Sequence, residues 1–486
     1  MKIWFITGSQ HLYGEEVLKK VADNTQYMVQ KLNNTGTLPF ELLWKPVVTC
    51  QEDITKMAED ANFDKECAGI ITFMHTFSPS KMWINGLVTL KKPYCHLHTQ
   101  FGREIPFGSI DMDFMNLYQS AHGDREHGFI GARLRKPRKI IVGYWENEEV
   151  VQQLADFMRV CAGVAECKNL KVARFGDNMR EVAVTEGDKV EAQIKLGMSV
   201  NYYPVGDLVV YVNAVTAAEV DAEYECVSNA YQIKTDDIDS VKYQIKIELG
   251  MKKFLEKGNF AAFTTTFEDL HGLEQLPGMA CQRLMGAGYG FSGEGDWKTA
   301  ALTRIMKVMA QGLKGGTSFM EDYTYHLPMG NETVLGAHML EVCPSIAENK
   351  PTVEVHPLGI GGKNPPARLK FNGKSGSAIC VSIVDMGGRM RMICQDVEAM
   401  QPPKDMPKLP VASVMWKPLP NLQTAAGCWI LAGGAHHTVM SYDLNVEHMR
   451  DFAELMEMEF IHISTHTDIN EMKKELLWND LAYKLK

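Results

Sequence analysis

The first third of the chain alternates short apolar runs with longer segments whose apolar residues recur at helical spacing. Glu15–Asn33 has such spacing, with Val17, Leu18, Val21, Met28 and Leu32 on one face. Strands alternating with helices predict a parallel, doubly wound sheet. The strands that we expect are Lys2–Thr7, Phe40–Val47, Ala68–Phe73, Pro93–His98 and Lys139–Gly143, and the other helices are Asp53–Asn62, Lys81–Leu90 and Val150–Cys161.

The middle third repeats this rhythm and predicts a second α/β domain. Its expected strands are Lys171–Phe175 and Ala261–Thr265. Its expected helices are Asp188–Leu196, Ala217–Ala230, Asp239–Glu256 and Trp297–Gln311.

After about residue 330 the pattern changes to closely spaced strand-like runs broken by Gly-Gly and Pro-Pro pairs. Such spacing favours an antiparallel sheet or barrel. The runs are Met339–Cys343, Val353–His356, Arg368–Phe371, Ala378–Val384 and Arg389–Gln395, followed by helices at Val446–Glu457 and Ile469–Trp478. We therefore predict an α/β protein with two doubly wound parallel-sheet domains and a C-terminal, mostly antiparallel, barrel-like β domain. The predicted boundaries are 1–168, 169–328 and 329–486.

Composition excludes several classes of protein. A formal net charge of −10 argues against a nucleic-acid-binding surface. The start, Met1–Thr7, reads as a strand, and no apolar run reaches the roughly 18 residues that would predict a membrane span. Eleven cysteines without a C-x-x-C pair fit reduced thiols better than a disulfide framework. We expect a cytoplasmic protein without membrane or nucleic-acid partners.

Ligands of doubly wound sheets gather beyond the carboxyl ends of strands, which directs attention to the loops Gly8–Gly14 and His75–Ser80. The first loop has no G-x-G-x-x-G, so a dinucleotide fingerprint is missing. Gln10 in this loop can serve either as a loop cap or as a ligand contact. Further along, Gln119 and His122 are three residues apart and can share a helix face.

The stretch from Gly293 to His338 contains two carboxylates and an imidazole of interest, Glu294, Glu321 and His338, and a Gly-Gly-Ala-His-His run follows at 433–437. Carboxylate oxygens with neutral imidazole nitrogens suit Mn, Mg, Zn or Fe(II). Structural interpretations stay open at this point. Glu294 can cap a helix that begins near residue 296, Glu321 can mark the end of a strand, and His338 can be a core histidine.

Five motifs taken together resemble the bacterial L-arabinose isomerase family, which is related to L-fucose isomerase. The match runs from end to end, with the motifs in the family's order: G-S-Q-H-L-Y-G at 8–14, H-T-F-S-P-S-K-M-W at 75–83, G-E-G-D-W-K-T-A at 293–300, M-E-D-Y-T-Y-H at 320–326 and G-G-A-H-H at 433–437. The resemblance implies three domains and a metal-dependent isomerase that converts L-arabinose to L-ribulose, the first step of arabinose catabolism. It also implies D-galactose as a second substrate and a homohexamer with active sites at subunit interfaces.

The resemblance further implies one divalent metal per subunit, most often Mn²⁺. Its ligands would be Glu294, Glu321, His338 and His437, although His436 is adjacent and the assignment can shift by one residue. The positions implied to contact the sugar are Gln10, Leu12, Gln119, His122, Met179, Phe267, Ile360 and His436.

The chemistry fits these residues, because moving a carbonyl from C1 to C2 requires proton transfer between the two carbons through a cis-enediol. We expect Glu294 and Glu321 to act as base and acid, with their order open. A hydride shift would need two closely spaced metals. The alternatives are a sugar-binding module, which needs neither carboxylate, and a metal-dependent lyase or epimerase, whose product differs. An NAD oxidoreductase is disfavoured by the missing glycine fingerprint.

Overall fold

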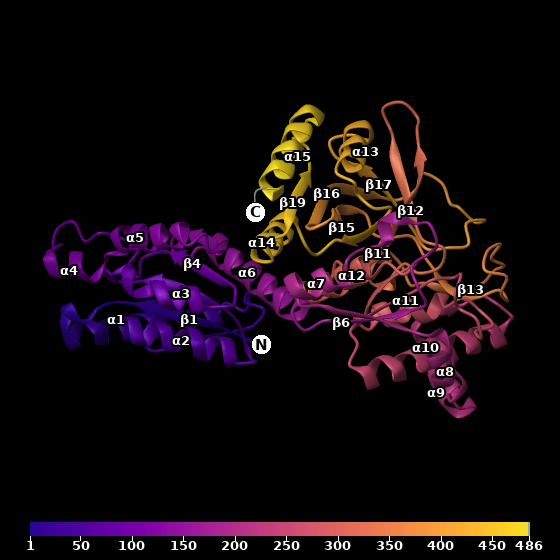
Figure 1. The fold of residues 1–486 in the computed structure, drawn as a ribbon, viewed down its shortest axis with the longest axis horizontal. Coiled ribbons are helices and arrows are strands. Elements are labelled where there is room, and N and C mark those ends of the chain that lie inside the picture. The colour runs from indigo at the N-terminus through magenta and orange to yellow at the C-terminus, as the bar shows by residue number, and fades with distance from the viewer. Residues whose placement is uncertain (485–486) are drawn as a thin grey trace. The chain divides into compact units, whose positions relative to one another are not determined.

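The computed structural model describes residues 1–484, and Figure 1 shows its helices and strands. The chain divides into two compact units. The first unit comprises Met1–Ala165 with Glu454–Glu457, and the second comprises Glu166–Ala453 with the residues from Met458 on. The three-domain division at 168/169 and 328/329 stays a prediction, and the last two residues of its third domain lie outside the described chain.

The first unit contains a five-stranded sheet in the order β2-β1-β3-β4-β5, and every neighbouring pair is parallel. This confirms the predicted doubly wound sheet. Its strands are β1 (Lys2–Gly8), β2 (Glu41–Trp44), β3 (Cys67–Met74), β4 (Tyr94–His98) and β5 (Lys139–Val142). Its helices are α1 (Gly14–Asn33), α2 (Gln51–Phe63), α3 (Ile84–Thr89), α4 (Met112–Leu117), α5 (Ser120–Arg133) and α6 (Glu148–Cys167), with 3₁₀ turns at His11–Tyr13 and Ser80–Trp83.

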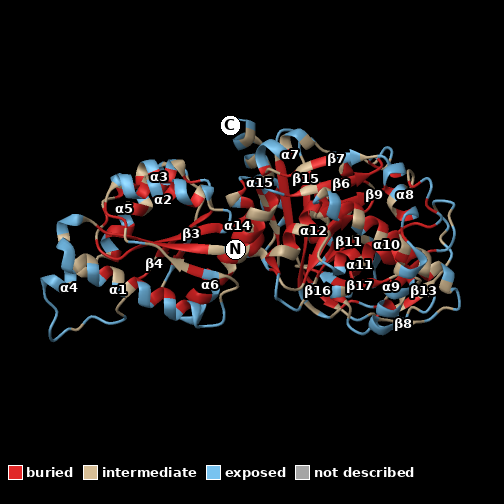
Figure 2. Ribbon diagram, turned by 90° about the horizontal axis from the view of Figure 1, so that it is seen from below, coloured by how far each residue is buried: buried red, intermediate tan, exposed pale blue. Residues whose placement is uncertain are grey.

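Helices cover both faces of this sheet, as Figure 2 shows. Successive side chains of β1 enter different cores because a strand points alternate residues to opposite faces. Ile3 and Phe5 pack with α1 and α6, whereas Trp4 and Ile6 pack with α2, α3 and α5. The strand order reverses between β1 and β3, so the loops that follow these two strands flank the point where doubly wound sheets bind ligands.

The second unit begins with a four-stranded parallel sheet in the order β10-β9-β6-β7. This sheet confirms the second predicted α/β region. The strands are β6 (Lys171–Phe175), β7 (Ser199–Tyr203), β9 (Ala262–Thr265) and β10 (Gly290–Ser292). The helices are α7 (Lys189–Leu196), α8 (Val205–Asn213), α9 (Ala217–Ala230), α10 (Ile238–Gly258), α11 (Gly278–Gly286) and α12 (Trp297–Met309), with a 3₁₀ turn at Ala183–Thr185.

Six antiparallel strands of the second unit close into a barrel in the order β15-β18-β11-β12-β17-β16, because β16 also pairs with β15. This confirms the barrel-like prediction. The strands are β11 (Thr317–His326), β12 (Thr333–Ala337), β15 (Gly376–Asp385), β16 (Met390–Met400), β17 (Ser413–Pro418) and β18 (His437–Ser441). One further strand, β19 (Glu459–Ile463), pairs with β16 in parallel. The remaining helices are α13 (Leu422–Leu431), α14 (Val446–Leu455) and α15 (Ile469–Lys484).

Two of the predicted C-terminal strands pair outside the barrel. They are β13 (Thr352–Val355) and β14 (Ala367–Lys370), which form a small sheet with β8 (Gln232–Ile233). The predicted strand Met339–Cys343 is wrong, since this segment is irregular apart from the 3₁₀ turn Pro344–Ile346 that follows it. Its backbone N–H groups find side-chain acceptors instead of a neighbouring strand: Leu340 donates to Glu341, and Cys343 donates to Ser318.

Candidate active site

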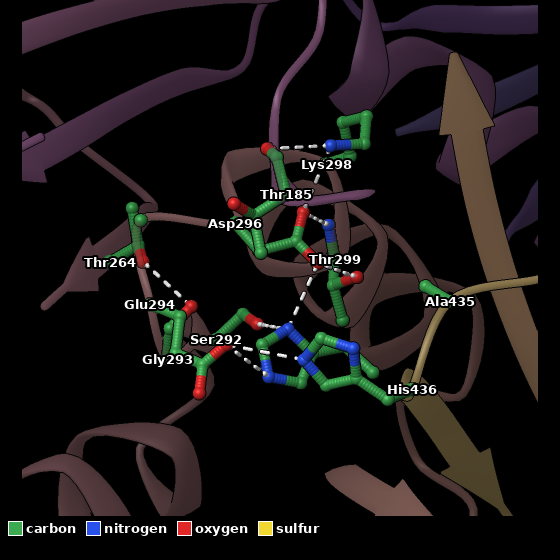
Figure 3. Close-up of polar contacts among 12 residues, drawn as sticks. Thr185, Thr264, Ser292, Gly293, Glu294, Asp296, Lys298, Thr299, Ala435 and His436 are labelled. Atoms are coloured by element: carbon green, nitrogen blue, oxygen red, sulfur yellow. Dashed lines mark hydrogen bonds and ion pairs between the residues drawn. The ribbon is translucent and has the colours of Figure 1, made fainter. Parts of the chain in front are cut away.

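Glu294 lies in the tight turn that joins β10 to α12. Its φ is +59° and that of Gly295 is +73°. A non-glycine residue in this left-handed region is strained by about 1–3 kcal/mol. The turn is held by hydrogen bonds from the Gly295 N–H to the Thr265 carbonyl (3.1 Å) and from the Thr264 hydroxyl to the Gly293 carbonyl (3.4 Å; Figure 3). Such maintained strain often marks a functional side chain.

Two histidines at the start of β18 meet the Glu294 carboxylate. Glu294 Oε2 lies 3.2 Å from Nε2 of His436 and 3.7 Å from Nε2 of His437. One ligand atom of each of the three residues lies within 4.8 Å of the others, and we call this group the metal cluster. His437 Nε2 is buried and has no hydrogen-bond partner within residues 1–484. One carboxylate oxygen and two imidazole nitrogens therefore lie close together, and one of these nitrogens is buried without a partner. Such a set of donor atoms fits a divalent cation.

Asp296 supports His437 from behind the cluster. Its Oδ2 accepts a hydrogen bond from His437 Nδ1 at 3.1 Å, which leaves Nε2 as the acceptor nitrogen that faces Glu294. The same carboxylate caps α12, accepting from the Thr299 N–H at 3.3 Å and from the Thr299 hydroxyl at 2.8 Å (Figure 3). The capping role considered for Glu294 therefore belongs to Asp296.

A buried lysine neutralises Asp296. Lys298 Nζ lies 3.3 Å from Asp296 Oδ1 and donates to the carbonyls of Thr185 (2.8 Å) and Glu186 (2.7 Å). Burial raises the pKa of Asp296, but the charge of Lys298 and the hydrogen bond from His437 outweigh it and hold the pKa well below its usual range. Burial lowers the pKa of His437. This arrangement pairs a carboxylate with a neutral imidazole, the form that binds a metal.

Glu294 and His436 form a hydrogen-bonded pair at the more exposed side of the cluster. Burial raises the pKa of Glu294, yet its hydrogen bond to His436 and the neighbouring histidines bring it below the usual value. The same hydrogen bond raises the pKa of His436. Glu294 is thereby kept as an ionised carboxylate.

His338 lies beside the cluster and has its own supporting carboxylate. Its Nδ1 donates to Glu341 Oε2 at 2.5 Å, and its ring centroid lies 5.7 Å from that of His437. Burial lowers the pKa of His338, but the charge of Glu341 and this hydrogen bond raise it overall. A Cβ added to Gly293 would lie 2.8 Å from His338 Cε1, so the glycine makes room for the imidazole.

Glu321 lies within β11, opposite His437 of β18 and Ala337 of β12. The expected end of a strand after Met320 is wrong, because β11 continues to His326 and the ladder pairs Glu321 on both sides. The charge of Glu321 contributes to the raised pKa values of His338 and His436. Glu321 therefore lies near the cluster, while its role as a ligand, like that of His338, stays a prediction.

Three predicted sugar contacts of the second unit surround Glu294. Phe267 and Ile360 line a pocket together with Glu294 and His338. The Met179 N–H donates to the Glu294 carbonyl at 3.0 Å. The structure thus brings these residues together from well-separated positions in the sequence.

Besides His436, which contacts Glu294, the remaining four predicted sugar contacts lie in the first unit. Gln10 and Leu12 follow β1, and the Leu12 side chain is 83% exposed. Gln119 is the N-cap residue of α5, and His122 is exposed in the first helical turn. All four lie in loops or in a helix start, as expected for residues that contact a ligand from outside the unit's core.

Two hydrogen bonds join the loops of the first unit. The hydroxyls of Ser9 and Thr76 are 2.7 Å apart, which links the loop after β1 to the loop after β3. The Gln119 N–H donates to the His75 carbonyl at 3.2 Å. The four predicted contacts are thus attached to the carboxyl ends of adjacent strands, where the doubly wound arrangement predicted a site.

Sequence reasoning missed the supporting residues Asp296, Lys298 and Glu341. The available signals were weak, since Asp296 at a helix start looks like an ordinary cap. Glu341 follows His338 by three residues. This spacing suggests a contact between the two side chains only once the segment is known to be irregular rather than a strand.

Comparisons with known proteins agree with this architecture. Three family profiles match in succession: the L-arabinose isomerase N-terminal domain at residues 1–169, the central domain at 171–312 and the C-terminal domain at 316–459. The L-arabinose isomerase of Geobacillus stearothermophilus is 57% identical over 489 residues, covering 99% of this chain and 98% of that protein. The chain belongs to the L-arabinose isomerase family. The L-arabinose isomerase of Tolumonas auensis is 55% identical over 491 residues, covering 100% and 98% of the two chains.

Membership of the L-arabinose isomerase family confirms the resemblance that the five motifs carried. A further relative, L-arabinose isomerase 1 of Bacillus licheniformis, is 57% identical over 488 residues and covers 99% of this chain and 98% of its own. No helix among residues 1–484 is long and apolar enough to cross a membrane.

Proposed function

We propose that this chain is an aldose–ketose isomerase that converts L-arabinose to L-ribulose, the first step of arabinose catabolism. The observation that carries the proposal is the meeting of Glu294 with His436 and His437, in a chain whose whole length aligns with L-arabinose isomerases. We also propose D-galactose as a second substrate, with D-tagatose as its product.

We propose one divalent metal per subunit, most often Mn²⁺, held by Glu294, Glu321, His338 and His437. Oxygen and imidazole donors suit such an ion. A bound ion supplies Lewis-acid stabilisation of negative charge that develops on the sugar oxygens, worth several kcal/mol. His436 is assigned to the sugar, and its 3.2 Å approach to Glu294 makes it the residue whose role most needs separating from that of His437.

Glu294 and Glu321 are proposed to move the proton between C2 and C1 of the open-chain sugar, one acting as base and one as acid, through a cis-enediol. The depressed pKa of Glu294 keeps it ionised and ready to accept a proton. Asp296 and Glu341 hold His437 and His338 in fixed orientations, so that little reorganisation accompanies the proton transfer.

The remaining predicted contacts are proposed to orient the sugar. Gln10 and His122 would bond sugar hydroxyls, and Leu12, Gln119, Met179, Phe267 and Ile360 would complete the pocket. We propose a homohexamer in which neighbouring subunits help to complete each active site. Eleven cysteines without a C-x-x-C pair suit a reducing compartment such as the cytoplasm.

The deciding experiment assays chelator-stripped protein with L-arabinose, with and without added Mn²⁺, alongside Glu294→Gln. We expect L-ribulose only with metal and none from the variant. Protein that binds Mn²⁺ and sugar but makes no ketose would contradict the isomerase and favour a lyase or a binding module.

Shared active sites predict complementation between defective subunits. Glu294→Gln and His122→Ala chains are each expected to be nearly inactive alone. Mixed hexamers, formed by denaturing and refolding the two together, should regain activity because some sites receive an intact residue from each chain. Recovery would be absent if every site lay within one subunit.

A further inference from the structure

A buried polar cluster in the first unit takes no part in the proposed chemistry. The Asp124 carboxylate of α5 accepts a hydrogen bond at each oxygen, from His96 Nε2 and from His98 Nδ1, both at 2.6 Å. Asp124 is 4% exposed and His96 is 3% exposed. Both histidines belong to β4, so the carboxylate fastens the helix to the strand with two charge-assisted bonds.

The buried face of α5 is polar where apolar residues would pack more favourably. Ser120, Asp124 and His127 follow one another at helical spacing, and all three are buried. Neither ring nitrogen of His127 has a hydrogen-bond partner within residues 1–484, and the ring packs edge-on against His96 and Trp83. Burying a carboxylate costs several kcal/mol, and apolar replacements of buried ion pairs are often neutral or stabilising. The stability of the fold therefore does not explain why this face of α5 is polar.

The first turn of the same helix carries two predicted sugar contacts, Gln119 and His122, and we call residues 119–122 the sugar-contact turn. Residues within and just after this turn bond two neighbouring strands. The Ser120 hydroxyl donates to the Met74 carbonyl at the end of β3 (2.9 Å), and Asp124 binds the end of β4. His122 lies on the exposed side of the turn, opposite these anchors.

We infer that Asp124 is a positioning residue for sugar binding, which fixes the sugar-contact turn through its two bonds to β4. The inference rests on the proposed function, since it needs Gln119 and His122 to contact the sugar. Backbone rotation of α5 would move both contacts together. Asp124 itself touches no substrate and acts only through the turn.

The test compares the full-length Mn²⁺-loaded protein with Asp124→Asn, which keeps the shape but presents an amide group to one of the two imidazole N–H groups. The KM for L-arabinose should rise roughly tenfold, because weakened hydrogen bonds from Gln119 and His122 reduce sugar binding and a factor of about ten corresponds to the loss of one such bond. The kcat should stay within about twofold and the Kd for Mn²⁺ should not change, as expected when uniform binding is lost. The control is Asp60→Asn, the same change at an exposed carboxylate paired with Lys56, which should leave KM unaltered.

A second pair of variants covers the case in which Asp124→Asn does not fold. His98 is partly exposed, and its replacement removes one of the two bonds. His98→Leu should raise KM, and His98→Asn, whose amide N–H reaches the place of Nδ1, should restore it. Equal KM values for both variants would show that the donor does not matter and would overturn the inference.

The possible failures are distinguishable. A wild-type protein that makes no ketose removes the proposed function and this inference with it. An active wild type beside an Asp124→Asn variant with unchanged KM overturns the inference alone.

Discussion

The metal cluster of the second unit and the sugar-contact turn of the first unit are held in opposite ways. In the cluster His437 is buried and is oriented directly by the Asp296 carboxylate, while Glu294 and His436 are half-buried; the neighbouring His338 is held in the same way by Glu341. In the turn the predicted sugar contact His122 is exposed and Gln119 is half-buried, and the buried support acts on the helix that carries them. A carboxylate that bonds a histidine directly fixes the orientation and the protonated nitrogen of that ring. A carboxylate that bonds only the helix fixes the backbone position from which a side chain extends. The two regions should therefore respond differently to the loss of one carboxylate.

The largest expected effect belongs to Glu321→Gln. The amide keeps the size of the side chain but cannot accept or deliver a proton, so kcat should fall by about 10²–10⁴-fold. Ketose formation measured over a range of L-arabinose concentrations gives both kinetic constants. Unchanged kcat with a raised KM would show that Glu321 binds the sugar and does not transfer the proton. The two regions would then respond alike to the loss of a carboxylate.

Lys298→Met tests whether the support of the cluster is electrostatic. The substitution leaves the buried Asp296 carboxylate without its lysine partner, and breaking a buried pair in this way costs about 3–5 kcal/mol. The free energy of unfolding in urea measures the loss. Lys56→Met breaks an exposed pair with Asp60 and should cost at most about 1 kcal/mol. Equal losses in the two variants would refute the electrostatic account.

Asp296→Asn should weaken metal binding. The amide continues to cap α12 but no longer holds His437 as a carboxylate does, and loss of such a partner costs roughly 10–100-fold in metal affinity. Calorimetric titration with Mn²⁺ measures the Kd. Asp237→Asn is a matched control, because Asp237 caps α10 through Ser240 without touching a histidine. A similar Kd for both variants would reduce Asp296 to a helix cap.

The smallest expected effect is a pH dependence of stability at Asp124. The hydrogen bond to Asp124 raises the pKa of His98, against the opposing effect of burial. A raised folded-state pKa gives stabilisation that is complete below the unfolded value of about 6.5 and is lost as pH rises through the folded value. The Tm difference between wild type and Asp124→Asn should therefore be larger at about pH 5.5 than at about pH 8.5. A difference that does not vary with pH would exclude protonation of His98 from the support.

The sequence predicted both parallel sheets, because the alternation of apolar strands and amphipathic helices is a local property. It did not predict how the barrel closes, since β15 pairs with the next strand, β16, and also with β18, which lies about 60 residues further along the chain, and no local pattern records that second pairing. The segment Met339–Cys343 was misassigned for a related reason. Its apolar residues Leu340, Val342 and Cys343 are buried, as in a strand of the core, but side chains rather than a neighbouring strand accept hydrogen bonds from its backbone.

The residues of the site also differ in whether a local sequence pattern reveals them. Glu294 and the histidine pair stand in chemically unusual motifs and could be identified from the sequence. Asp296 and Asp124 could not, because a capping aspartate and an aspartate within a helix are ordinary residues until their partners are known. His96 and His98 come from another strand, and only folding brings them to Asp124.

Under the proposed catalytic role of Glu294, its left-handed backbone places stability and activity in opposition at a single position. Glycine would relieve backbone strain of about 1–3 kcal/mol there, so a chain selected only for persistence at high temperature would tend to discard this glutamate. Screens for heat-resistant variants should accordingly measure turnover as well as survival, because a glycine at this position would relieve the strain and, under the proposed role of Glu294, would remove the activity.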